Sequence, residues 1–510
     1  MAANLNEDAY RKEQLEFISN IHGTTAREII LVILPSVCSL LLRITTFVLI
    51  GKHLNGITRF ITEFIVVLLP TILCFTVYSD SKISVCMALL VASFINVLVV
   101  IFTSNSARSG RYLSTHSARR PFLTNFRSLT GVLTAICILA VDFKVFPRRY
   151  AKTEVYGFSL MDTGVGFFIM SNALVSPEAK DSSQNVELGF VKAIAKNFVD
   201  CVRSCITLLV LGSVRYFSIE YLNYQRHVSE YGVHWNFFVT LAAVKILTSI
   251  VTTVLSSRYS LIVGIFIITV YEFVLSQNNV RQWLFSHSRE GFVNANKEGL
   301  VSTLGYVGLY FIGVAIGRLI HSTYQRASKN QTDKFKVDSY FRIKIFGYII
   351  DARYTESMIL CIKLSLIAAQ ACAAMLFLNS YSRVSRKLAN AGYCVWMVTL
   401  STTMLTLLVL IDVITDILKQ LSVKEDIGKK TSKVKQESYQ LSSIPEILEA
   451  VNYNGLPFFL VCNLITGGIN LTIKTLYVPD NEALQIITAY VLVSTALFAI
   501  LYKYKIKIKF

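Results

Sequence analysis

Apolar residues follow one another in long blocks along almost the whole chain, and short polar stretches separate the blocks. Each block holds roughly 18–24 residues, the length that a helix needs to cross a bilayer core of ~30 Å. About thirteen blocks are present, and they centre near residues 40, 69, 93, 136, 168, 208, 247, 268, 310, 367, 407, 465 and 492. Charges interrupt the pattern around Asp162 and Glu272. The pattern predicts an all-α, polytopic membrane protein with about thirteen transmembrane helices.

Composition agrees with this class. Hydrophobic residues make up 53% of the chain and charged residues 16%, whereas soluble domains carry about 25% charged residues. The net charge of +18 does not indicate a nucleic-acid partner, because the cations lie in loops between apolar blocks and follow a topological pattern. The first 26 residues lack the apolar core of a signal peptide, so we expect the first spanning helix to act as its own signal anchor.

The ten cysteines lie within or at the edges of apolar blocks, and none forms a CxxC pair. Cysteines in buried helices usually behave as small hydrophobic residues. We therefore expect no disulfide, no metal site and no bound cofactor.

The distribution of Lys and Arg predicts the topology. When the loops are numbered alternately, one set carries about 28 cations and the other about 16, and the richer set is cytosolic by the positive-inside rule. Its most basic loops lie near residues 104–127, 321–355 and 419–445. The N-terminus is then lumenal and the C-terminus cytosolic, which requires an odd number of spans. Residues 1–510 are expected to form a single integral-membrane domain.

The first polar cluster follows the apolar run that ends at Val141. Pro147 stops any helix from continuing, so the chain is expected to turn and bring Lys152 back toward Asp142. Charges at helix ends often form structural ion pairs or extend to the interface. A carboxylate half-buried in an apolar cleft would instead have a raised pKa and serve as a general base. Both interpretations remain open for this pair.

The second cluster is the polar and aromatic run at residues 224–238, which lies between two apolar blocks. Such a run is typical of an interfacial belt of Tyr and Trp with solvated histidines. It is equally suited to a wall that stacks on a sugar and hydrogen-bonds its hydroxyls. The candidate binding residues in this run are His227, Glu230, Tyr231, His234, Trp235 and Asn236.

Three further clusters are weaker on their own. Residues 294–299 resemble a helix start whose amides point at an anion, although a plain cap would look the same. Residues 384–390 hold two cations that could bind phosphate or simply lie at the interface. Asparagines 463 and 470 lie seven residues apart on one helix face, where they could also join helices. The candidates here are Asn296, Lys297, Glu298, Arg386, Lys387, Asn390 and Asn463.

Taken together, these motifs resemble one family, the inositol acyltransferases of GPI-anchor biosynthesis, or PIG-W family, of the endoplasmic reticulum membrane. The most specific matches are residues 138–142 (ILAVD), 146–152 (FPRRYAK), 161–166 (MDTGVG), 230–238 (EYGVHWNFF), 295–299 (ANKEG) and 384–390 (VSRKLAN). The resemblance implies transfer of a fatty acyl chain from acyl-CoA to the inositol 2-hydroxyl of glucosaminyl-phosphatidylinositol. It also implies that an aspartate and a lysine at the positions of Asp142 and Lys152 are catalytic.

The sequence departs from the family pattern at four places. Lys144 stands where proline is usual, and Arg226 where an acid is usual. Lys297 and Lys387 stand where arginine is frequent. None of these departures touches Asp142 or Lys152, but all of them bear on contacts with the lipid head group.

The residues themselves fit this chemistry. A thioester is already activated, so a secondary hydroxyl needs only a base, alignment and help for the oxyanion. Asp142 would be the base, and Lys152 would stabilise the oxyanion or the leaving thiolate, or orient the carboxylate. The candidates for the substrate phosphates are Arg148, Arg149, Lys297, Arg386 and Lys387. The glucosamine amine would favour Glu230 or Glu298.

Two other functions remain open. The chain could be another membrane sugar acyltransferase, with His234 or His227 as its base. It could also be a lipid or solute transporter. Transporters often show related halves and broken helices at mid-depth, whereas this sequence shows no internal repeat and gathers most of its polar motifs at one membrane face.

Overall fold

The computed structural model describes residues 10–103 (except 11 and 15), 120–180, 190–221, 228–286, 288–330, 340–345, 348–353, 355–422 and 442–508. The first half contains α2 (Ala26–Ile50), α3 (Gly56–Glu63), α4 (Leu69–Phe75), α5 (Lys82–Thr103), α6 (Pro121–Ala140), α7 (Thr163–Leu174), α8 (Phe190–Tyr221), α9 (Val228–Tyr231) and α10 (Phe237–Val254). The second half contains α11 (Ser260–Ser276), α12 (Asn278–Phe285), α13 (Gly291–Ala295), α14 (Lys297–Asn330), α15 (Glu356–Leu378), α16 (Ala391–Ser422), α17 (Glu446–Tyr453), α18 (Gly455–Thr472) and α19 (Asp480–Lys503). A π-helical turn, Phe64–Leu68, joins α3 to α4.

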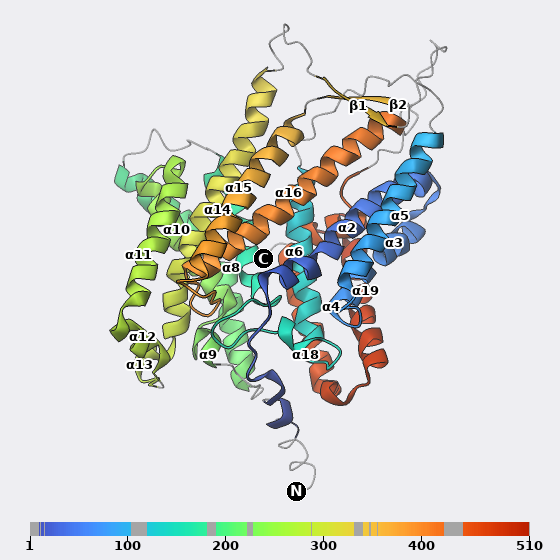
Figure 1. Cartoon of the computed structure of the whole chain (residues 1–510). Coiled ribbons are helices and arrows are strands. Elements are labelled where there is room, and N and C mark those ends of the chain that lie inside the picture. Colours follow the sequence, from blue (N-terminus) through green and yellow to red (C-terminus); the bar gives the residue numbers. More distant parts are fainter. Residues whose placement is uncertain are drawn as a thin grey trace.

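The long helices run side by side between two faces of the molecule (Figure 1). Eleven helices in the described part of the chain are long and apolar enough to cross a membrane. Peripheral helices expose large apolar side chains, such as Phe94 and Phe102 of α5, as expected where lipid replaces water. The predicted class, a polytopic helical membrane protein, is confirmed.

Eleven of the thirteen predicted centres coincide with these spans. The other two fall on α7 and α8. With 12 residues, α7 extends only about 18 Å, less than a bilayer core. The 32-residue α8 is long enough but is not among the spans that pass on length and composition. The number of spans in the described part of the chain is therefore odd if both α7 and α8 cross the membrane or neither does, and even if only one of them crosses.

The predicted basic loop near 321–355 contains the only sheet in the described part of the chain. Strands β1 (Tyr340–Ile345) and β2 (Tyr348–Arg353) pair antiparallel as a hairpin. The hairpin lies at one end of the bundle, and α9, α12 and α13 lie at the opposite end (Figure 1).

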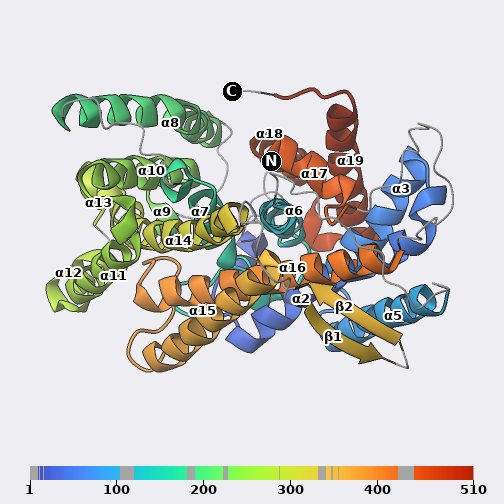
Figure 2. The same ribbon diagram turned by 90° about the horizontal axis from the view of Figure 1, so that it is seen from above.

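Helix α6 lies near the middle of the bundle when it is viewed from above (Figure 2). It packs against α7, α16, α17, α18 and α19, and most of its residues are buried. In the same view α8 lies at the edge of the molecule, beside α10. The C-terminal end of α6 is therefore held on several sides by other helices.

Loops from distant parts of the sequence meet at the end of the bundle opposite the hairpin, which we call the site face. Thr24 forms a β-bridge with Phe158, and the Gly157 amide donates to the Val384 carbonyl. Gly157 has φ +138°, and a Cβ there would lie 2.4 Å from the His22 carbonyl oxygen, so the close approach requires glycine. The loops that meet here are residues 20–28, 76–82, 141–162, 228–236, 277–298 and 379–390.

Candidate active site

A cavity of about 570 Å³ opens behind the site face. Its lining comes from α6, α7, α8, α10, α18 and the loops around residues 152, 230 and 386. One part of the lining is charged and includes Asp142, Lys152, Arg215, Glu230 and Arg386. The rest is mostly apolar and reaches along α6 from Val141 back to Thr130. The cavity therefore suits a molecule with a polar head and an apolar tail.

Asp142 lies in the turn directly after α6. Its amide donates to the Leu139 carbonyl at 3.2 Å. This bond adds a tighter turn to the end of α6 and includes Asp142 in it. The Asn470 side-chain amide of α18 donates to the Asp142 carboxylate at 2.8 Å. Burial raises the pKa of Asp142 to about 6, although Asn470, Arg148 and Lys152 all favour the ionised form. The carboxylate is thus poised as a base close to neutral pH.

Three aromatic anchors shape the segment between Asp142 and Lys152. Phe143, Phe146 and Tyr150 are fully buried, and the Tyr150 hydroxyl donates to Glu28 at 2.9 Å. The anchors pin the turn to the core and leave Lys152 at the cavity. The turn that Pro147 predicted is present, but the Lys152 ammonium pairs with Glu230 at 2.9 Å rather than with Asp142.

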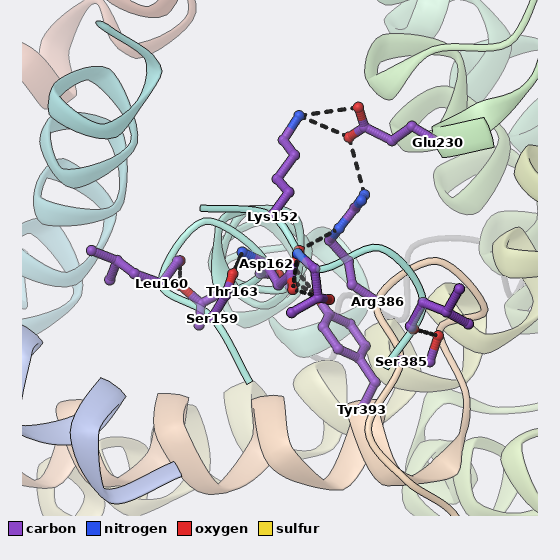
Figure 3. Close-up of polar contacts among 12 residues, drawn as sticks. Lys152, Ser159, Leu160, Asp162, Thr163, Glu230, Ser385, Arg386 and Tyr393 are labelled. Atoms are coloured by element: carbon purple, nitrogen blue, oxygen red, sulfur yellow. Dashed lines mark hydrogen bonds and ion pairs between the residues drawn. The ribbon is translucent and has the colours of Figure 1, made fainter. Parts of the chain in front are cut away.

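Figure 3 shows that Lys152 belongs to a chain of charged groups. Glu230 accepts from Lys152 and also from the Arg386 guanidinium at 3.1 Å. Arg386 in turn donates to Asp162 at 2.7 Å, and Thr153 donates to the other Asp162 oxygen at 2.6 Å. Burial alone would raise the pKa of Glu230, but Lys152 and Arg386 hold it at about 2. Cations and anions therefore alternate along this row of charged side chains. It begins with Lys152 at the cavity and ends with Asp162 inside the protein.

Asn296 holds the loop that carries the second polar cluster. Its side-chain oxygen accepts from the His234 and Trp235 amides at 2.8 and 3.0 Å. Asn236 caps α10 by accepting from the Phe238 and Val239 amides. Glu230, Tyr231, His234, Trp235 and Asn236 all line the cavity. The predicted cluster is brought together at the cavity wall, whereas His227 lies outside the described residues.

Asn390 holds the loop that carries Arg386. It is buried, and its side-chain oxygen accepts from the Ser385 and Tyr393 amides at 3.0 and 3.1 Å. Its amide group donates to Ser382 and to the Arg383 carbonyl. Asn390 thus acts on the site through the backbone and is not part of the cavity lining.

Arg148 and Arg149, for which contact with substrate phosphate stays a prediction, both contact other groups of the protein. Arg148 donates to the Val141 carbonyl at 2.7 Å and lies over the Phe17 ring. Arg149 pairs with Glu28 and Asp80. Both guanidinium groups lie outside the cavity lining. Arg149 has two acidic partners, whereas Nε and Nη2 of Arg148 are buried without a hydrogen-bond acceptor in the described part of the chain.

Lys297, Glu298 and Lys387 form a second group outside the cavity lining. Lys297 is fully buried, and its ammonium donates to the carbonyls of Trp283 and Ser286. Both oxygens of Glu298 accept from Arg289 at 2.7 Å. Lys387 lies over the Phe285 ring. These contacts fasten the turn between α12 and α13, and the roles of these residues in binding phosphate and amine stay predictions.

Asn463 lies on the cavity wall, on one face of α18 with Thr466 and Asn470. It donates to the Phe459 carbonyl of its own helix at 2.7 Å. Asn470, whose weaker signal in the sequence was also compatible with a contact between helices, donates to Asp142. The sequence did indicate this position, because a spacing of seven residues places Asn470 on the same helix face as Asn463.

Sequence reasoning also missed Asp162 and Arg215 as candidates. The signal for Asp162 was present, because it interrupts an apolar run and a charge at such a position is usually functional. Arg215 is an exposed cation near the C-terminal end of α8, and it favours the ionised form of Glu230. Its position on the cavity followed only from the packing of α8 against α10.

The fold and the cavity together define a polytopic membrane protein with a charged site that adjoins an apolar slot, as an enzyme of lipid chemistry requires. The profile of the GWT1 family matches residues 10–501. The chain belongs to the GWT1 family, which confirms the family resemblance in the sequence.

Three relatives show how far the similarity extends. GPI-anchored wall transfer protein 1 of Candida albicans is 32% identical over 98% of both chains. Phosphatidylinositol-glycan biosynthesis class W protein of Dictyostelium discoideum is 30% identical over 99% of this chain and 100% of its own. Glucosaminyl-phosphatidylinositol-acyltransferase PIGW of Homo sapiens is 30% identical over 95% of this chain and 96% of its own.

Proposed function

We propose that this protein is a membrane acyltransferase of GPI-anchor biosynthesis. It transfers a fatty acyl chain from acyl-CoA to the inositol 2-hydroxyl of glucosaminyl-phosphatidylinositol, in the endoplasmic reticulum membrane. The names of the relatives support the reaction class and the lipid acceptor. The observation that carries the proposal is Asp142, a carboxylate with a pKa of about 6 in a cavity that is charged in one part and apolar in the other.

The reaction begins when Asp142 accepts the proton of the inositol hydroxyl. The oxygen then attacks the thioester carbonyl carbon, and a new C–O bond forms as the carbonyl becomes an oxyanion. The oxyanion collapses, the C–S bond breaks, and the CoA thiolate leaves and takes the proton from Asp142, which regenerates the carboxylate. Lys152, on the same cavity wall, stabilises the negative charge on the oxyanion or the thiolate. No redox cofactor takes part in this sequence.

The remaining cavity residues suit the two substrates. Both substrates carry phosphate, and Arg215 is a cation at the cavity with its side chain exposed. Glu230 is the acid suited to the glucosamine amine, because it lines the cavity, whereas Glu298 lies outside the lining. The apolar lining along α6 would hold the acyl chain.

The orientation follows from the charges. The hairpin, which belongs to the basic stretch near 321–355, lies at the end of the bundle opposite the site face (Figure 1). If this side is cytosolic, the site face and the N-terminus are lumenal and the C-terminus is cytosolic.

A histidine base is the second candidate mechanism, because His234 also lines the cavity. Its ring stacks on Phe292, and its Nδ1 lies 3.3 Å from the Asn296 amide. These contacts support a role in shaping the wall. The activities of Asp142→Asn and His234→Ala distinguish the two candidate bases.

The function is tested by lipid profiling of cells that lack the protein. We expect glucosaminyl-phosphatidylinositol to accumulate without an inositol acyl chain, and the wild-type gene to restore acylation. The purified protein should also acylate glucosaminyl-phosphatidylinositol with acyl-CoA as the only donor. A lipid profile with normal inositol acylation, together with an inert purified protein, would exclude this function.

A further inference from the structure

Glu230 pairs with two cationic side chains, and these differ greatly in how exposed and how constrained they are. The Arg386 side chain is 5% exposed and is fixed from its other side by Asp162. The Lys152 side chain is 45% exposed, and both of its hydrogen bonds in the charged chain go to Glu230. Arg386 is therefore a permanent partner of Glu230, and Lys152 is a partner that another cation can replace.

The position of Lys152 has a mechanistic consequence. While its ammonium is held at Glu230, it is turned to the acid rather than to Asp142, although both residues line the same cavity. A lysine side chain is a compact point charge on a flexible four-carbon stem. It can move within the cavity once its carboxylate partner is taken by another group.

We propose that the protonated amine of the glucosaminyl head group replaces Lys152 at Glu230 and releases Lys152 to the reacting carbonyl beside Asp142. This inference rests on the proposed function. Glu230 thereby selects a lipid with a free amine over its N-acetylated form, which carries no positive charge at that nitrogen. Binding of the amine lipid therefore also brings Lys152 to Asp142 and completes the catalytic pair.

Glu298 offers a matched comparison on the same face of the protein. Like Glu230, it is an acid with a cationic partner on both oxygens, here Arg289, but it lies outside the cavity lining. Replacing Glu298 should affect the packing of the α12–α13 turn without affecting the choice between amine and amide.

The first test measures kcat/KM for glucosaminyl-phosphatidylinositol and for its N-acetylated form, with one acyl-CoA. We expect the wild-type protein to prefer the amine by at least about tenfold, as for a site built around a charged partner. Glu230→Gln should reduce the preference to within about threefold, and Glu298→Gln should leave it unchanged.

The second test measures binding of the same two lipids to purified Lys152→Ala without acyl-CoA, and does not depend on turnover. If Lys152 competes with the substrate amine, its removal should tighten binding of the amine lipid about two- to fivefold, the value of a part-exposed ion pair. Binding of the N-acetylated lipid should not change. Arg215→Gln, which removes a cavity cation without freeing Glu230, should not tighten amine binding.

The outcomes separate the two proposals. A wild-type protein that acylates neither lipid excludes the proposed function. A wild-type protein that acylates both lipids equally, or a preference that survives in Glu230→Gln, overturns the exchange alone. Unchanged or weaker binding of the amine lipid to Lys152→Ala also overturns it, because a lysine that only contributes to binding would give that result.

Discussion

At the scale of single residues, the site depends on how far each charge is removed from water. Asp142 keeps one hydrogen bond from Asn470, and its partial removal from water raises its pKa. Glu230 is half-buried, but two cations hold its pKa low. Two carboxylates in one cavity are therefore suited to different tasks, one to accept a proton and one to remain charged.

Asp142→Asn should lower kcat/KM for acyl transfer roughly 10²–10⁴-fold, because asparagine keeps the shape but cannot accept the proton. Expression and the thermal unfolding midpoint should stay close to wild type. His234→Ala is the control for the alternative base and should retain far more activity. Near-normal turnover by Asp142→Asn alongside an inactive His234→Ala would transfer the base to histidine.

The dependence of kcat/KM on pH should also show that Asp142 is the base. A base acts only when ionised, so kcat/KM should fall about tenfold per pH unit below the pKa of Asp142, which burial raises to about 6. Activity is thus lost as the pH falls through 6 and is retained above it. The measurement is kcat/KM between pH 5 and 8 in purified protein. An acid limb that persists in the residual activity of Asp142→Asn would assign it to another group.

Lys152→Ala should also lose roughly 10²–10⁴-fold in kcat, and the Asp142→Asn/Lys152→Ala double mutant should lose little more, because residues that act as a unit are not additive. Steady-state kinetics of the two single mutants and the double mutant test this. Losses that multiply would show that the two residues act independently.

At the scale of elements, the side chains proposed to be catalytic lie on loops, and buried asparagines hold the neighbouring loops in place. Asn296 fixes the loop before α10, Asn390 fixes the loop before α16, and Asn236 caps α10. Each satisfies backbone amides that would otherwise be buried without a partner. The rigid helices thus position the site through a few side-chain amides.

Asn390→Ala should destabilise the protein by about 2–4 kcal/mol, because the Ser385 and Tyr393 amides lose their acceptor. Activity should fall further than stability alone explains, since the Arg386 loop is released. The thermal unfolding midpoint in detergent and the specific activity are the two readouts. Asn463→Ala is the stability control, because Asn463 donates only to its own helix and no amide depends on it. Equal midpoints for the two variants would contradict the role of Asn390.

At the scale of the whole molecule, topology decides which face meets the lumen. The sequon at residues 330–332 begins at Asn330, the last residue of α14, whose other end begins at the site face. The proposed orientation places this end in the cytosol. The site face, the acceptor lipid and the catalytic pair then share the lumenal side.

Asn330 should therefore carry no glycan, because glycosylation takes place in the lumen. The check is the electrophoretic mobility of the expressed protein with and without glycosidase. A glycosidase-sensitive shift that disappears in Asn330→Gln would reverse the orientation. A sequon introduced into a loop on the site face would serve as the positive control.

The sequence by itself determined the class, most of the spans and the family. A helix in lipid must satisfy its own backbone and present apolar side chains over a fixed length, so eleven of the predicted centres appear as spans. The motifs also located the candidate base and the cavity wall, because polar residues are costly near membrane depth unless they have a function. The predicted span near residue 168 corresponds to the shorter α7. In the sequence, the apolar residues that flank this short helix extend the apolar block to the length of a span.

Only the tertiary structure decided which charges meet. Lys152 is ten residues from Asp142 but pairs with Glu230, and Arg386 pairs with Asp162 on another loop. Arg149 and Lys297 resembled substrate ligands in sequence, yet the protein supplies their partners. The physical reason is that ion pairs act over a few ångströms, and the packing of distant helices sets those distances.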